Sequence, residues 1–206
     1  MRKFACLIFV GLGVLMPAKA DLIFTGSQAG MCCFDVTLHQ VSSGDVLVTA
    51  TLTDGAQWFV DTGSGNHPGF AFNISGDPSI NITNLSTPWG SGDVHLTKVD
   101  TNGPSLGTFD YYIDNPGNGA SLHNAGPLSF DVIGAGLLVT DFTTAAGSSD
   151  YFVADIMDAA GATGLSGITA GAPGPGPIPE PASILLFATV GLGLVVTQRR
   201  RLGKLF

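Results

Sequence analysis

Short runs of alternating apolar and polar residues make up most of the chain, and turn-forming residues separate these runs. Residues 34–39 and 46–53 show the alternation most clearly. A period of two is typical of strands that bury one face. Further strands are expected at 57–60, 70–74, 94–99, 107–113, 128–133, 137–142 and 151–156. No amphipathic helical pattern interrupts them, so the sequence predicts an all-β fold, an antiparallel β-sandwich with the jelly roll as one variant.

The folded body is expected to be one domain over residues 21–160, which is long enough to bury a hydrophobic core. Residues 161–178 are rich in Gly, Pro and Ala, and within them 171–177 alternate flexible residues with prolines that lack an amide proton. Such a segment is expected to form neither helix nor strand. We interpret 161–178 as a spacer.

The amino-terminal segment, residues 1–20, has the pattern of a secretory signal peptide. Arg2 and Lys3 precede an apolar stretch over 4–15, and Ala18 and Ala20 form the small-residue pattern of a cleavage site. We therefore expect export through the Sec machinery, with Asp21 as the first mature residue.

A second apolar run lies near the other end, over residues 182–197. It is about 16 residues long, slightly shorter than the roughly 17 to 25 residues of a typical transmembrane helix. Arg199, Arg200 and Arg201 follow it and can extend its reach by snorkelling. Basic residues stay on the cytoplasmic side, so the run is predicted to hold the chain in the membrane with the body outside. The alternative, a buried core helix, does not explain this basic cluster.

Pro179, Glu180 and Pro181 stand directly before this run. The order of tripeptide, short span and arginine cluster over residues 179–206 resembles the PEP-CTERM sorting signal of Gram-negative bacteria. The resemblance implies that the three motif residues are recognised by an exosortase, and that the span is temporary. It also implies a cell-envelope location, membrane-anchored or extracellular after processing. The bodies of such proteins vary, so it implies no activity for residues 21–160.

The body is strongly acidic, with fifteen aspartates between residues 21 and 178 and a single base, Lys98. Such a surface repels polyanions, so nucleic acid and anionic membrane surfaces are not expected as partners. Asp also favours turns and caps, which explains many of these residues without any ligand.

We expect no cofactor, and structural calcium is the alternative that the acidic composition leaves open, because Ca²⁺ binds carboxylate and carbonyl oxygens. The sequence contains no EF-hand loop and no calcium-binding repeat. Two local groups are the best candidates, although neither has a diagnostic spacing: Asp110, Asp114 and Asn115, and Asp54, Asp61 and Asn66. Four histidines also recur at equal intervals, but their flanks share no pattern and no zinc-binding pair is present: His39, His67, His95 and His123. The metal ligands therefore remain unspecified.

Residues 61–64, Asp-Thr-Gly-Ser, are similar to the catalytic loop of aspartic proteases. That chemistry needs two carboxyl groups sharing a proton, and with one such loop the second would have to come from a homodimer. The alternative is an ordinary turn at the end of a strand. No nucleophile elbow and no phosphate-binding loop is present. We therefore expect no catalytic residues.

Exposed aromatic side chains can stack on sugar rings, and Trp58 and Trp89 are the candidate ligand-binding residues. The expected function is a noncatalytic structural or adhesive role at the cell surface or in the extracellular matrix. The alternative is a carbohydrate-binding module for extracellular polysaccharide, and an aspartic-protease-like enzyme comes third. For Cys32 and Cys33, free thiols, a vicinal bridge and bonds between chains all stay open.

Overall fold

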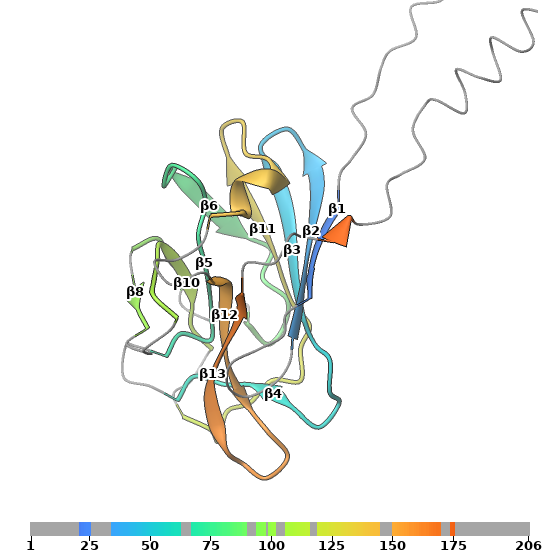
Figure 1. The fold of residues 1–206 in the computed structure, drawn as a ribbon, viewed down its shortest axis with the longest axis vertical. Coiled ribbons are helices and arrows are strands. Elements are labelled where there is room, and N and C mark those ends of the chain that lie inside the picture. The colour runs from blue at the N-terminus through green and yellow to red at the C-terminus, as the bar shows by residue number, and fades with distance from the viewer. Residues whose placement is uncertain are drawn as a thin grey trace, which may run out of the picture. The chain divides into compact units, whose positions relative to one another are not determined.

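The computed structural model describes residues 21–25, 34–62, 67–89, 94–97, 99–101, 106–115, 119–144, 150–169 and 174–175. These residues form an all-β structure in which every strand pair is antiparallel (Figure 1). The all-β, antiparallel prediction is confirmed.

Two sheets of six strands account for most of the structure. Sheet A has, in spatial order, β14 (Gly174–Pro175), β1 (Asp21–Thr25), β2 (Phe34–Ser42), β3 (Asp45–Leu52), β11 (Leu128–Gly134) and β6 (Ile80–Thr83). Sheet B has β13 (Thr163–Thr169), β12 (Asp150–Met157), β5 (Phe70–Phe72), β10 (Tyr111–Ile113) and β7 (Val94–His95), with β4 (Trp58–Phe59) also paired to β12. A third sheet pairs only β8 (Val99–Asp100) with β9 (Thr108–Phe109).

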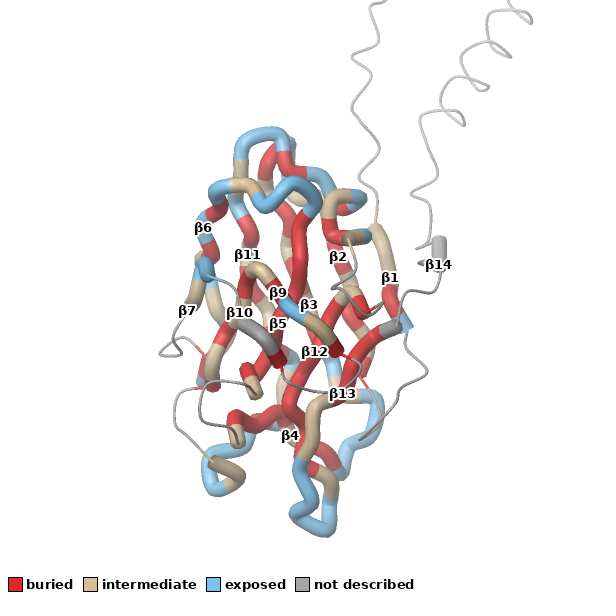
Figure 2. Tube along the Cα trace, turned by 60° about the vertical axis from the view of Figure 1, so that its left-hand side comes forward, coloured by how far each residue is buried: buried red, intermediate tan, exposed pale blue. Residues whose placement is uncertain are grey.

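The main hydrophobic core contains buried side chains from both large sheets. In sheet A, the alternation predicted from the sequence places Val36, Leu38 and Val48 inward, and the register sets Leu38 opposite Val48. In sheet B, Phe70 and Phe72 are fully buried. The ring centroids of Phe70 and of Phe130 in sheet A lie 6.0 Å apart, and the two rings meet edge to face. Figure 2 shows buried positions running along the strands of both sheets. Each fully buried side chain of this size stabilises the fold by about 1.5–3 kcal/mol.

Sheet B is also covered on its other side, by a smaller apolar cluster. Ala71 and Val153, which alternate with core residues along β5 and β12, pack with Leu106 and Phe109. Phe109 belongs to β9, so the small third sheet lies over this face. This explains why β5 is buried at all three positions.

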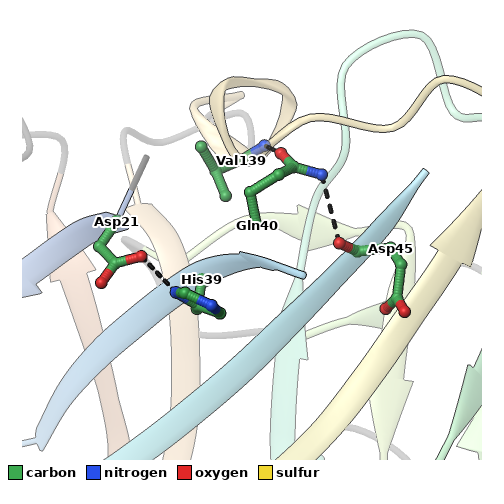
Figure 3. Close-up of polar contacts among 5 residues, drawn as sticks. All are labelled: Asp21, His39, Gln40, Asp45 and Val139. Carbon is green, nitrogen blue, oxygen red and sulfur yellow. Dashed lines mark hydrogen bonds and ion pairs between the residues drawn. The ribbon is translucent and has the colours of Figure 1, made fainter. Parts of the chain in front are cut away.

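Gln40, near the end of β2, binds backbone groups of β3 and of the segment at the start of η2. Its Nε2 donates to the carbonyls of Asp45 (3.2 Å) and Leu137 (3.1 Å), and its Oε1 accepts from the Val139 N–H (2.9 Å). Figure 3 shows this side chain between β3 and the 3₁₀ helix η2 (Val139–Phe142). The amide group thereby satisfies backbone groups at the β2–β3 turn and at the start of η2.

The strand expected at 137–142 is wrong, because this segment contains η2 instead. Val139 and Phe142 are buried, and their spacing of three residues fits a 3₁₀ turn rather than a strand. The Asp141 carboxylate accepts from the Leu138 N–H at 2.8 Å, which closes the turn. The expected strand at 107–113 is interrupted at Asp110, whose N–H donates to the Asn73 side chain instead (2.8 Å). β1 and β6 were not anticipated from the sequence.

The domain end at residue 160 and the spacer over 161–178 also need correction. β13 pairs with β12 over its whole length, so the folded body extends at least to Thr169. Gly167 suits this strand, because a Cβ there would lie 2.7 Å from Leu106. Gly174 and Pro175, expected to form no strand, pair with Ile23 and Leu22 of β1.

Both terminal signals lie outside the described residues: the signal peptide at 1–20 and the sorting signal at 179–206. Cys32 and Cys33 lie outside them too. Among the described residues, no helix has the length and apolarity that a bilayer crossing requires.

Candidate functional site

Asp114 and Asp155 lie close enough to Asp61 for their negative charges to act on its carboxyl group. We call Asp61, Asp114 and Asp155 the carboxylate cluster. Asp61 follows β4, Asp114 follows β10, and Asp155 lies within β12. The pairing of β4 with β12 continues beyond β4, because the Val60 N–H donates to the Asp155 carbonyl at 3.0 Å. This brings residues 61 and 62 alongside Asp155.

Asp155 is a fully buried carboxylate whose main partner is Thr62. The Thr62 N–H and hydroxyl both donate to Oδ2 of Asp155, at 2.8 Å and 2.5 Å. The His67 Nδ1 lies 3.9 Å from the same oxygen. The other oxygen, Oδ1, has no hydrogen-bond partner among the described residues. Burial raises the pKa of Asp155, and the bonds from Thr62 oppose that shift.

Asp61 is almost completely buried, with 4% of its surface exposed. Burial raises its pKa to about 7, and the negative charges of Asp114 and Asp155 add to the shift. Its carbonyl accepts from the Gly119 N–H at 2.6 Å. The protonation of Asp61 is therefore expected to change near neutral pH.

Asp114 has a cationic partner when His95 is protonated, since its Oδ2 lies 3.0 Å from the His95 Nε2. The His95 ring stacks on Tyr112, with centroids 4.1 Å apart and planes 8° from parallel. Burial and the nearby Asp114 charge raise the pKa of Tyr112. His67 and His95 thus lie beside the cluster, each next to a different aspartate.

The arrangement brings together two carboxyl groups from distant parts of one chain. The sequence led us to seek a second carboxylate for Asp61 in a homodimer, whereas the structure supplies Asp155 in the same chain. Asp61 is nearly buried and Asp155 is fully buried. The signal that would have identified Asp155 is an aspartate inside the apolar run 152–156.

Several members of the two calcium candidates of the sequence have other contacts in the structure. Asp54 is exposed and its carboxylate accepts from the Ala56 N–H, a turn contact, whereas Asp61 is buried. Asn66 lies outside the described residues. The Asn115 side chain donates to the Leu122 carbonyl at 2.8 Å. Where the structure describes the chain, no group of three or more acidic, histidine or cysteine side chains is arranged to hold a metal ion.

The four equally spaced histidines have four different partners. His39 pairs with Asp21, and His123 contacts Trp58. His67 and His95 approach different aspartates of the carboxylate cluster. They do not form a common site.

The two candidate sugar-binding tryptophans differ in exposure. Trp58 is half-buried, and its ring meets His123 edge to face at 5.1 Å. Trp89 is fully buried, with its ring 5.7 Å from Phe59. The expectation that Trp89 offers a stacking face is therefore wrong, because core packing covers it.

The sorting residues Pro179, Glu180 and Pro181, the basic residues Arg199, Arg200 and Arg201, and the cleavage residues Ala18 and Ala20 lie outside the described residues. No protein-family model, no curated protein and no solved structure matches the chain.

Proposed function

We propose that the chain is an exported protein of the cell surface or extracellular matrix, sorted by an exosortase, with a noncatalytic structural or adhesive body. The observation that carries the proposal is that the first and last strands of the body lie between the two terminal signals, directly next to one and close to the other. β1 begins at Asp21, the residue after the proposed signal cleavage site. β14 ends at Pro175, four residues before Pro179.

We also propose that sheets A and B form a β-sandwich. Support comes from the main core, which contains inward-facing residues of both sheets. The jelly roll is a less favoured variant, because β1, β2 and β3 are consecutive neighbours within one sheet.

A noncatalytic role is favoured by the burial of Asp61 and Asp155. A general acid or base must come within hydrogen-bond reach of a substrate atom. Asp61 and Asp155 are shielded from solvent, and the Asp155 carboxylate already accepts two hydrogen bonds from Thr62. The contact between Asp155 and Thr62 is better explained as part of the packing between β4 and β12.

The test is fractionation of a bacterial host that carries an exosortase, followed by mass spectrometry of both ends of the protein. The expected product begins at Asp21 and has lost the apolar tail. Glu180→Ala should leave the tail attached and the protein in the membrane fraction. Pro177→Ala, a proline just outside the motif, is the matched control and should be processed normally.

An uncut chain of 206 residues in the soluble cytosolic fraction would contradict the proposal. Normal tail removal in Glu180→Ala would contradict the exosortase assignment while leaving export intact.

The second candidate function is a carbohydrate-binding module, which the half-exposed Trp58 beside His123 supports. Aromatic rings of this kind stack on the apolar faces of sugars. A polysaccharide array with the purified body is the test, and Trp58→Ala should abolish retention. Tyr151→Ala, a half-buried aromatic residue packed on Phe24, is the control. Equal retention of both variants, or none by the parent protein, would exclude Trp58 as a sugar site.

A further inference from the structure

The first and last described strands lie side by side at one edge of sheet A. β1 pairs with β14, with Leu22 opposite Pro175 and Ile23 opposite Gly174. Because the pair is antiparallel, the beginning of β1 lies next to the end of β14. The chain therefore enters and leaves the body at the same corner.

This corner is fastened to the neighbouring strand by a side-chain contact. Asp21 is opposite His39 in the β1–β2 register, and its Oδ1 lies 2.5 Å from the His39 Nδ1 (Figure 3). Both side chains are partly exposed. The first residue of the body is thus held at a defined place on sheet A.

Because β14 pairs with β1, only a short segment connects the last described strand to the apolar run. Residues 176–181 alone stand between Pro175 and the start of that run at Ala182. Six residues span at most about 20 Å when fully extended. If the whole of 161–181 were free, the same limit would be roughly 70 Å.

The body has an opposite end, away from this corner. The β2–β3 turn lies at one end, and the β12–β13 turn and β4 lie at the other, in both Figure 1 and Figure 2. β2 alone has nine residues, which corresponds to roughly 30 Å along a strand. Trp58 pairs with Met157 close to the β12–β13 turn, so it belongs to the far end.

We infer that the corner of sheet A formed by Asp21, His39 and Pro175 faces the lipid bilayer, and that the end bearing Trp58 faces outward. The inference rests on the proposed function, because it needs the run 182–197 to enter the membrane. The short tether then holds this corner near the headgroups. Any ligand of the body meets the Trp58 end first.

The test measures energy transfer from single-cysteine probes to acceptor-labelled lipids in vesicles that carry the full chain. Ser43 and Ala160 are exposed residues in the β2–β3 and β12–β13 turns, and each is changed to Cys in a chain with serine at Cys6, Cys32 and Cys33. Transfer from position 43 is expected to be at least twice that from position 160. A further variant carries twenty Gly and Ser residues after Pro175, which add roughly 25 Å of flexible reach. In that variant the difference between the two positions should disappear.

The outcomes separate the inference from the function on which it depends. A chain that floats with the vesicles and shows equal or reversed transfer overturns the orientation and leaves membrane anchoring intact. A chain that does not float with the vesicles overturns both.

Discussion

Thr62 donates two hydrogen bonds to one carboxylate oxygen of Asp155, one from its backbone N–H and one from its hydroxyl. Asp155 lies in β12 and Thr62 follows β4, so this contact closes the end of sheet B where the two strands pair. The hydroxyl is the only side-chain hydrogen-bond donor to Asp155 among the described residues.

Thr62→Val is expected to lower the free energy of unfolding by about 1.5–3 kcal/mol, the usual cost of losing a hydrogen bond to a buried charged group. Valine keeps the shape of threonine and removes only the hydroxyl. Urea denaturation measures the change. Thr51→Val, at an exposed position of β3, is the control and should change stability by less than about 0.5 kcal/mol. Equal effects of the two variants would show that the contact between Thr62 and Asp155 contributes nothing to the free energy of unfolding.

The stability of the body is expected to fall as pH rises through about 7, the pKa of Asp61 in the folded chain. A carboxyl group with a higher pKa in the folded than in the unfolded chain binds its proton more tightly when folded. Its contribution is complete below the unfolded pKa, about 4, and is lost as pH passes the folded pKa. Burial also raises the pKa values of Asp35, Asp45 and Asp155, which act in the same direction.

Urea denaturation at pH 5, 6, 7 and 8 measures this dependence. Asp61→Asn carries no titrating group at that position, so its free energy of unfolding should change less over the same range. If the parent and the variant have the same slope, Asp61 does not titrate in this window.

Gln40→Met is expected to lower the free energy of unfolding by about 1–3 kcal/mol, because the backbone groups of Leu137, Val139 and Asp45 lose a partner. Methionine has nearly the same length and no polar group. Hydrogen exchange should be faster at the Val139 amide, and less affected at the strand amides of β12, which lies in the other sheet. Unchanged protection of Val139 would contradict the bridging role of Gln40.

Gly44→Ala is expected to cost roughly 2 kcal/mol, the range for a side chain forced into a positive-φ conformation. Gly44 has a φ of +85°, and an added Cβ would lie 2.5 Å from the Gly134 carbonyl oxygen. Gly55→Ala is the matched control, since nothing lies within 4 Å of its added Cβ. Thermal denaturation of the two variants distinguishes them, and equal midpoints would contradict the close approach at Gly44.

Period-two alternation was sufficient to predict β2, β3 and β11, because each buries one face against a common core. It failed for η2, whose buried residues are three apart rather than two. It also failed for β13, where Gly167 looks like a weak point in the sequence but is needed for contact with Leu106 and Asp150.

The carboxylate cluster could be predicted only in part. Asp61 stands in a recognisable motif, but Asp155 is 93 positions away from the Thr62 that binds it. Such a pairing depends on the register of β4 against β12, which local patterns do not specify. The burial of Trp89 is likewise set by packing against Phe59 from another segment.

Pro175 affects how closely copies of the protein can pack without their sheets pairing edge to edge. An exposed strand edge invites pairing with the edge of a second molecule, which leads to aggregation. β14 pairs with β1 at Leu22 and Ile23 and so occupies that part of the edge of sheet A, and Pro175 has no amide proton to donate to a second molecule. A dense layer of these molecules can therefore pack this side of the body against neighbours without the sheets fusing into fibres.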